Sequence, residues 1–182
     1  MKTKNKYGFF IPLMHKHEYE FIEKYLNKND ILLEWGSGNS TLYLSDLVTK
    51  IISIEHDKDW IENIQNGINT YDIPNIELNY IPSHSPDPIP CRYEQFKDYV
   101  EFPNNNKLKF TKVLIDGRAR KYCAKSIYNM IDEDVIVIIH DYNRPDYQLV
   151  EKYYDVIEQL TDGQGIAALK KKSIVIEDNN YY

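Results

Sequence analysis

The chain has 182 residues, of which 42% are hydrophobic, and this length favours one domain with a single packed core over residues 1–182. The net charge is −6 and only four arginines are present, so we expect no dedicated nucleic-acid-binding surface. No apolar run approaches the roughly 20 residues that a membrane-spanning helix needs, so we expect no membrane partner.

The two cysteines and the N-terminus suggest a compartment. Cys91 and Cys123 form neither a CxxC pair nor a zinc-binding pattern, and this suits a reducing environment. Pro12 interrupts the apolar stretch near the N-terminus, and a secretory signal peptide would need a longer one. We therefore expect a cytoplasmic protein.

Strand-like and helix-like segments alternate in the first half of the chain. Apolar spacing predicts helices over 15–28, 39–48 and 57–68 and strands over 30–35, 50–55 and 75–81. Asn39 or Ser40 is the expected N-cap of the second helix and Asp57 that of the third, since short polar side chains accept from free helical N–H groups. Trp60 is expected on the packed face of the third helix.

The middle of the chain interrupts this alternation. The segment 82–90 contains four prolines, so it cannot be a helix or a central strand. Residues 91–110 are expected to hold a short helix. We interpret the segment 83–110 as an insertion or a lid loop that shapes an acceptor pocket.

Alternation returns after residue 110. We predict strands over 112–116 and 134–140, helices over 119–131 and 145–161, and a terminal hairpin of strands over 165–171 and 173–177. Continuous apolar strands separated by helices are typical of a parallel sheet that is covered on both faces. The fold class is therefore α/β, doubly wound and mostly parallel, with an antiparallel terminal pair.

The sequence LLEWGSGNST, residues 32–41, forms a glycine-rich turn at the end of the first strand. Gly36 and Gly38 allow positive φ and a close approach to a ligand, while Thr41 stands where a dinucleotide fingerprint has its third glycine. Glu55 ends the second strand, where an acid can accept hydrogen bonds from both hydroxyls of a ribose. The pair indicates a nucleoside-type cofactor; the alternative is a tight turn and a helix-capping acid.

Four motifs carry a resemblance to a known superfamily. LLEWGSGNST and ISIEHDKDW resemble the first two motifs of class I S-adenosylmethionine-dependent methyltransferases. VLIDGRAR and VIVIIHDYNRPDY resemble motifs of a branch that is similar to glucuronoxylan O-methyltransferase-like proteins and, more distantly, to metal-dependent sugar O-methyltransferases. The resemblance implies a seven-stranded Rossmann-like sheet of order 3-2-1-4-5-7-6. It also implies methyl transfer from S-adenosylmethionine to a sugar, a glycan or another small hydroxylated acceptor.

The resemblance also implies roles at the glycine turn and beyond it. The turn would wrap the amino-acid end of the cofactor, and Glu55 would hold its ribose. His56 and Asp57 would lie beside the adenine or cap the next helix, with the loop 83–85 nearby. The expected cofactor-binding residues are Glu34, Gly36, Gly38, Asn39, Ser40, Thr41, Glu55, His56 and Asp57.

Acidic residues also follow the fourth and fifth predicted strands. Asp116 ends one strand and Asp141 follows the other, so their carboxylates are expected on the same rim as the glycine turn. Two carboxylates suit Mg²⁺ or Mn²⁺, and the resemblance implies Asp116 and Asp141 as metal ligands, with His140 or Asn143 as a third. The alternative is that Asp116 belongs to a turn and Asp141 caps a helix.

The same rim supplies the expected catalytic residues, His140, Asp141 and Asp116. His140 has a suitable intrinsic pKa to take the proton of a substrate hydroxyl, although a buried histidine that satisfies a backbone carbonyl is an equal alternative.

Three of the four arginines, Arg118, Arg120 and Arg144, follow these two strands. They suit an anionic group of the acceptor or, alternatively, pair with the rim aspartates. The rival functions are an NAD(P)-binding oxidoreductase and a non-catalytic partner subunit.

Overall fold

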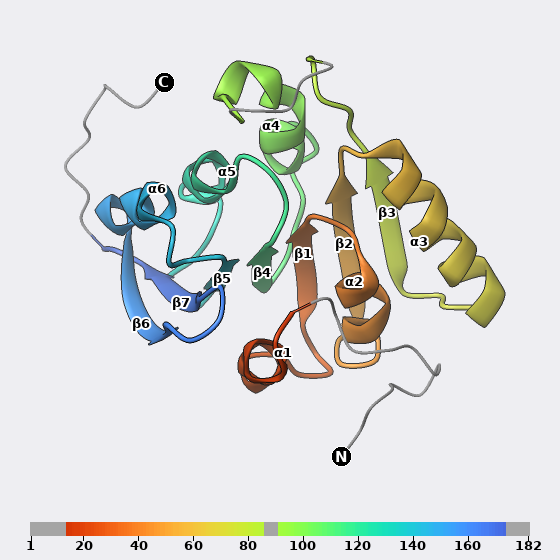
Figure 1. The fold of residues 1–182 in the computed structure, drawn as a ribbon, viewed down its shortest axis with the longest axis horizontal. Helices are drawn as coiled ribbons and strands as arrows, with labels where there is room; N and C mark the ends of the chain where they lie inside the picture. Colours follow the sequence, from red (N-terminus) through yellow and green to blue (C-terminus); the bar gives the residue numbers. More distant parts are fainter. Residues whose placement is uncertain (1–13, 86–90, 174–182) are drawn as a thin grey trace.

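The central sheet consists of short strands that alternate with helices along the chain (Figure 1). The structure is a computed structural model that describes residues 14–85 and 91–173. Its strands are β1 (Ile31–Trp35), β2 (Lys50–Glu55), β3 (Ile76–Tyr80), β4 (Lys112–Ile115), β5 (Ile136–His140), β6 (Tyr154–Leu160) and β7 (Ile166–Lys171). They form one seven-stranded sheet of order β3-β2-β1-β4-β5-β7-β6, which confirms the predicted fold class.

The strand register brings the ends that matter for function to one edge of the sheet. β1 lies between β2 and β4 and pairs with both in parallel, with Leu33 opposite Ile52 and Val113. The segments that follow β1, β2, β4 and β5 therefore leave the sheet on the same side. Strand β7 runs antiparallel to both of its neighbours, β5 and β6.

Six α-helices and two short 3₁₀ turns precede or connect the strands within the described residues. They are α1 (Lys16–Lys24), α2 (Asn39–Leu44), α3 (Lys58–Tyr71), α4 (Lys97–Asn105), α5 (Arg120–Ile127) and α6 (Pro145–Gln148), with 3₁₀ turns η1 (Tyr93–Gln95) and η2 (Leu149–Lys152). Asp57 is the N-cap of α3, as predicted, and its side chain accepts from the N–H groups of Asp59 and Trp60. The N-cap of α2 is Gly38 and not the predicted Asn39 or Ser40.

Apolar side chains from both faces of the sheet build the core. On one face, Phe96 of the segment before α4 and Cys123 of α5 pack with Leu33 and Val137. On the other face, residues of α1 and α2 cover the strands, with Ile22 of α1 completely buried. Figure 1 shows α4 and α5 above the strands and α1 below them. Both faces of the central strands β1, β4 and β5 are covered, so these strands are buried along almost their whole length.

The segment predicted as an insertion or lid carries a helix that packs in the core. Phe96, Tyr99 and Val100 are each 0% exposed. The indole Nε1 of Trp35 donates a hydrogen bond to the carbonyl of Tyr99 at 3.0 Å, which fixes α4 against β1. Residues 86–90, in the proline-rich part of this segment, lie outside the described residues.

The helix predicted over 145–161 is wrong beyond its first residues. Only α6 and the 3₁₀ turn η2 are helical there, and the rest of the segment is strand β6. Side chains of β6 alternate between more buried and exposed positions, as the pleat of an edge strand requires. The terminal hairpin is therefore β6–β7. The strand predicted over 173–177 falls almost entirely outside the described residues.

Two further properties of the described residues concern the helices and the cysteines. None of the helices in residues 14–85 and 91–173 combines the length and the apolar character needed to cross a membrane. Cys91 and Cys123 are both free thiols. Cys123 is fully buried, and this burial raises the pKa of its thiol well above the ordinary value, so it packs as an unreactive apolar side chain.

Candidate functional site

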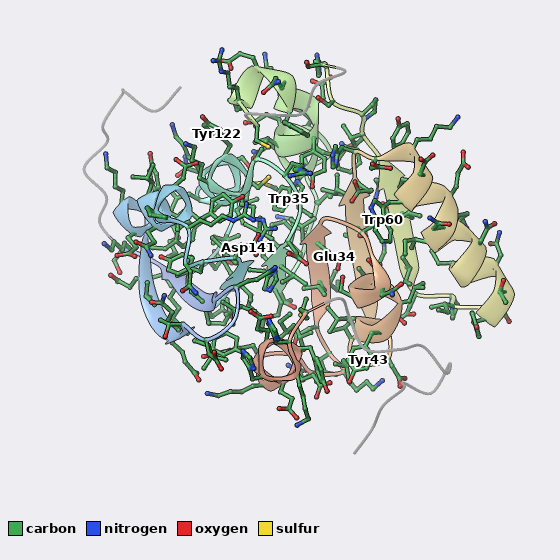
Figure 2. The ribbon with its side chains drawn as sticks, viewed as in Figure 1. Glu34, Trp35, Tyr43, Trp60, Tyr122 and Asp141 are labelled. Atoms are coloured by element: carbon green, nitrogen blue, oxygen red, sulfur yellow. The ribbon has the colours of Figure 1, made fainter. Side chains whose placement is uncertain are left out.

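A cavity of about 400 Å³ opens at the carboxyl ends of β1, β2 and β4, where the strand order reverses. Ligands of open α/β sheets bind at such a switch point, and the volume suits a small molecule. Figure 2 shows Trp60 on the α3 side of Glu34 and Asp141 on the β5 side. The cavity is lined by Met14, Gly36, Ser37, Gly38, Asn39, Ser40, Glu55, His56, Asp57, Trp60, Asp116, Gly117, Arg118 and Arg120.

Two glycine-containing turns meet at the floor of this cavity. Gly36 has φ +97°, and a Cβ on it would lie 2.5 Å from the backbone nitrogen of Gly117. A Cβ on Gly117 would in turn meet the hydroxyl of Tyr99 at 2.1 Å and the nitrogen of Gly36 at 2.9 Å. The turn after β1 and the turn after β4 therefore pack backbone against backbone, and only glycine fits on either side.

Glu34 supports the glycine turn from behind and does not line the cavity. It is 0% exposed and accepts hydrogen bonds from Ser40 Oγ at 3.0 Å, Thr41 Oγ1 at 2.6 Å and Ser53 Oγ at 2.6 Å. Burial raises the pKa of Glu34 to about 7 against the opposing effect of these three hydroxyls, and the charge of Asp116 adds to the rise. Thr41 is equally buried. Glu34 and Thr41 therefore support the glycine turn from the protein interior, by holding the first residues of α2.

Glu55 lies in the cavity wall and is held by the backbone around it. Its Oε1 accepts from the N–H groups of His56 and Asp57, and its Oε2 accepts from the N–H of Ser37, each at 2.8 Å. A carboxylate has about four acceptor positions. Glu55 is therefore fixed in orientation and keeps about one position for a ligand hydroxyl, fewer than the two that the sequence suggested.

Aromatic rings surround the wall next to Glu55. The ring of His56 packs edge-on against Phe96 and Tyr99, with centroids 5.3 Å and 5.7 Å apart. Trp60 lines the cavity with 40% of its surface exposed, although its helical spacing had suggested packing alone. Its place in the first turn of α3, three residues after the N-cap at the carboxyl edge of the sheet, is the signal that could have identified it.

A second cavity of about 300 Å³ adjoins the first through His56 and Asp57. It is lined by His56, Asp57, Lys58, Asp59, Tyr80, Pro82, Ser83 and Ser85. The loop 83–85 thus reaches this region through its serines. His84 instead lies 3.0 Å from Asp98 in an exposed ion-pair contact.

The two rim aspartates are bridged by an arginine. Arg120 Nη2 lies 3.3 Å from Asp116 Oδ1 and 3.0 Å from Asp141 Oδ2. Among residues 14–85 and 91–173, no cluster of three or more potential metal ligands is present. A guanidinium between the two acids does not fit a divalent cation in the same place, so the predicted Mg²⁺ or Mn²⁺ site at Asp116 and Asp141 is not supported.

The three rim arginines have different environments. Arg120 is 7% exposed and donates to the carbonyl oxygens of Gly117, Asp116 and His140. Arg144 lies outside the cavity lining, pairs with Asp141 at 3.0 Å and places its guanidinium over the ring of Tyr147.

Arg118 is exposed and lines the cavity. The predicted arginine cluster therefore divides into one structural residue, one surface pair and one residue that faces the cavity.

His140 is buried between carboxylates and does not line the cavity. Its Nδ1 lies 2.8 Å from Asp116 Oδ1, and its Nε2 lies 3.3 Å from Glu18 Oε2. Burial lowers the pKa of His140, but the bond to Asp116 and the contact with Glu18 outweigh it, so the pKa lies above the ordinary value. A histidine whose two ring nitrogens face carboxylates and which lies outside the cavity lining is not placed to deprotonate a substrate.

Glu18 is the partner of this network that the sequence analysis missed. It is 0% exposed and accepts from the N–H of His15 at 2.8 Å and from the N–H of Gln164 at 3.0 Å. Burial raises the pKa of Glu18, but these N–H groups and His140 lower it below the ordinary value. An acid at the third position of a helix can indicate a capping box, although His15 is an uncommon N-cap.

Buried polar atoms without a regular hydrogen bond concentrate around the cavity. In the described residues, His56 Nδ1, Tyr99 Oη and His140 Nε2 are three of the four such atoms. His56 Nδ1 is 2.7 Å from Glu55 Oε1 but lacks hydrogen-bond alignment, and His140 Nε2 faces Glu18 in the same way. Such atoms are rare in folded proteins, and of these three only His56 belongs to a residue that lines the cavity.

No protein-family model matches the sequence, and no curated protein matches it either. Among solved structures, a methyltransferase-like protein from Silicibacter pomeroyi superposes with a TM-score of 0.70 at 23% identity, with 91% of this chain and 90% of that chain covered. A candidate methyltransferase from Streptococcus mutans in complex with SAH gives 0.60 at 14% identity, covering 87% and 100%. A candidate caffeoyl-CoA O-methyltransferase from Staphylococcus aureus gives 0.61 at 16%, covering 89% and 86%.

At these identities the similarity shows the fold. The chain has the Rossmann-like architecture of methyltransferase structures, and its similarity extends over nearly the whole length of these three chains. The predicted resemblance to the sugar O-methyltransferase branch stays a prediction.

The first prediction concerns the charge on His140. His140→Asn keeps an N–H near Asp116 but cannot be charged, so near pH 6 we expect the free energy of unfolding to fall by about 3 kcal/mol. Because the folded pKa of His140 is raised, its stabilisation is fully present below the unfolded pKa and is lost as pH rises through the folded pKa. Urea denaturation between pH 6 and pH 9 should show the two proteins converging.

The matched control for this experiment is His84→Asn. His84 also contacts a carboxylate, but the side chain is 48% exposed, so the variant should differ from the wild type by less than about 1 kcal/mol at every pH. A His140→Asn deficit of constant size across the pH range would show that the charge of His140 is not what stabilises the network.

The second prediction concerns the contact between the two glycine turns. Gly117→Ala should lower the free energy of unfolding by about 2 kcal/mol, because overpacking of a tight site has that cost. Tyr99→Phe alone should have little effect, since the Tyr99 hydroxyl has no aligned hydrogen-bond partner among the residues that the structure describes.

The double variant should lose about 1 kcal/mol less than the sum of the two single changes, because the hydroxyl at 2.1 Å is then gone. Urea denaturation of the four proteins measures this coupling. Strict additivity would mean that Tyr99 does not limit the space at Gly117.

Proposed function

We propose that the protein transfers a methyl group from S-adenosylmethionine to a hydroxyl oxygen of a small acceptor, such as a sugar or a glycan unit. The observation that carries this proposal is the placement of Glu55. Its carboxylate is fixed by three backbone N–H groups and faces a cavity at the switch point of the sheet, next to the turn of Gly36. That arrangement suits a ribose bound beside a glycine turn.

The residues around Glu55 fit the rest of such a cofactor. The backbone at Gly36 and Gly38 lets a ligand approach closely, which suits the amino-acid end. The exposed face of Trp60 and the ring of His56 offer apolar and aromatic surface for a nucleobase. When bound, the sulfonium of S-adenosylmethionine supplies an electrophilic methyl carbon, and the protein must align a nucleophile with that carbon.

Asp116 is the rim acid placed to orient that nucleophile. Its Oδ1 is held by His140 and Arg120, while its Oδ2 has no hydrogen-bond or ion-pair partner in the part of the chain that the structure describes. Asp116 also lines the cavity. In this proposal Asp116 Oδ2 accepts the hydrogen bond of the acceptor hydroxyl and takes its proton, and His140 and Asp141 act as positioning residues.

The proposal contains no metal ion, because Arg120 holds the place between Asp116 and Asp141. The rival functions make different predictions about ligands. An NAD(P)-binding oxidoreductase would bind NAD⁺ in the same cavity, and a non-catalytic subunit would bind neither cofactor. The cytoplasmic location and the absence of nucleic-acid and membrane partners stay predictions.

The third prediction tests the cofactor directly by calorimetric titration. S-adenosylhomocysteine should bind and NAD⁺ should not. Glu55→Gln should weaken S-adenosylhomocysteine binding by about tenfold or more, since a hydrogen bond to a charged group contributes roughly 1.5–3 kcal/mol.

Glu77→Gln is the matched control, because Glu77 is a solvent-exposed acid on β3 that pairs with Lys50. Its affinity for S-adenosylhomocysteine should equal that of the wild type. Urea denaturation first establishes that Glu55→Gln is folded, since Glu55 also accepts from three backbone N–H groups. Unchanged affinity in the folded variant would remove Glu55 from the site, and preferential binding of NAD⁺ would replace the methyltransferase proposal by the oxidoreductase.

A further inference from the structure

The ionisable groups at the ends of β4 and β5 form a closed set of opposite charges. The acids are Glu18, Asp116 and Asp141, and the cations that contact them are Arg120, Arg144 and His140. Each acid of this set contacts at least one of the three basic side chains, so the set is balanced among its own members.

Arg118 remains outside this balanced set. Its guanidinium has no hydrogen bond, ion pair or ring contact within residues 14–85 and 91–173, and its side chain is exposed at the cavity. Arg120 and Arg144, by contrast, are both occupied by Asp141. An unpaired guanidinium presents five N–H donors in a planar fork that matches carboxylate and phosphate oxygens.

The backbone beneath Arg118 is fixed, so its position at the cavity is defined. Arg120 Nε donates to the carbonyl of Gly117 at 2.9 Å, and Cys123 Sγ donates to the carbonyl of Arg118 at 3.5 Å. Asp116, two residues earlier, lines the same wall and carries the unpaired Oδ2. A small ligand held by Arg118 therefore shares the cavity with the carboxylate that is proposed to receive the acceptor hydroxyl.

We infer that Arg118 binds an anionic group of the methyl acceptor, so that the acceptor is a small hydroxylated molecule carrying a carboxylate or a phosphate. This inference rests on the proposed function and adds the substrate class. The donor also carries a carboxylate, which Arg118 would contact in the competing arrangement. The two arrangements differ because a donor contact affects S-adenosylhomocysteine binding, whereas an acceptor contact affects a separate anion.

The fourth prediction uses inorganic phosphate and acetate as probes, titrated into the protein with and without saturating S-adenosylhomocysteine. One or both anions should bind to the wild type in both states. Arg118→Gln should weaken this binding at least tenfold. The affinity of Arg118→Lys should lie between those of the wild type and Arg118→Gln, because lysine keeps the charge but loses the planar fork of N–H donors. Arg92→Gln, which removes an exposed arginine outside both cavities, should change nothing.

A second titration separates the acceptor from the donor. S-adenosylhomocysteine and 5′-methylthioadenosine, which lacks the amino-acid part, should each bind to Arg118→Gln as they bind to the wild type. If Arg118→Gln lost the binding of S-adenosylhomocysteine but kept that of 5′-methylthioadenosine, Arg118 would be assigned to the donor carboxylate and the inference would be overturned. Anion binding that competes with S-adenosylhomocysteine, that persists in Arg118→Gln or that is absent from the wild type would also overturn it.

These experiments also distinguish this inference from the proposed function. If S-adenosylhomocysteine fails to bind while phosphate or acetate still binds through Arg118, the methyltransferase proposal fails and the anion site stands, but not as an acceptor site. If S-adenosylhomocysteine binds and the anions do not, the methyl donor stands and the anionic acceptor is excluded.

Discussion

The buried guanidinium of Arg120 is the interaction on which the functional edge of the sheet depends. Its N–H groups donate to carbonyl oxygens at the ends of both β4 and β5, and it pairs with Asp116 and Asp141. A cation this buried needs compensating charge, because removal of either partner leaves an uncompensated charge in a poorly solvated place. The two aspartates therefore have a structural role, because they balance the charge of Arg120. The guanidinium also connects the segments that follow β4 and β5, which the hydrogen bonds of the sheet do not join.

This neutralisation decides which groups remain free for a ligand. His140 and Arg120 both contact one oxygen of Asp116. Arg144 pairs with Asp141, and Glu18 of α1 contacts His140. Within the described residues, the charged groups at this edge that keep no partner are Asp116 Oδ2 and the guanidinium of Arg118. A carboxylate oxygen and a cation that line the same cavity can orient a hydroxylated anion without a metal ion. The chemistry of the site thus follows from what the buried charges leave unpaired.

The features that depend on neighbouring residues could be predicted from the sequence. Examples are most of the strands, the N-cap Asp57 and the glycine turn. The strand β6 was missed because Val150, Tyr154 and Ile157 are spaced as on one face of a helix, whereas the alternation from Tyr154 onward fits a pleated edge strand equally well. Glu18 was missed for another reason. Its partners His140 and Gln164 are more than 100 residues away, and no local pattern records such a pairing. The pairing of Arg120 with Asp116 spans only four residues, but the same spacing suits an arginine that binds an anion, so the sequence left both roles open.

The contact between Gly36 and Gly117 links the two halves of the cavity. Gly36 belongs to the turn that would hold the methyl donor, and Gly117 lies between Asp116 and Arg118, which would hold the acceptor. Because the two turns touch through backbone atoms, with Tyr99 next to Gly117, the main chain fixes the separation of the two turns that, in our proposal, hold the donor and the acceptor. Methyl transfer depends mainly on holding two reactants in line at a short distance, where an error of about 1 Å can cost 10²-fold in rate. A backbone contact between glycines sets such a distance more rigidly than contacts between long side chains would, because it leaves no side-chain rotamers to vary.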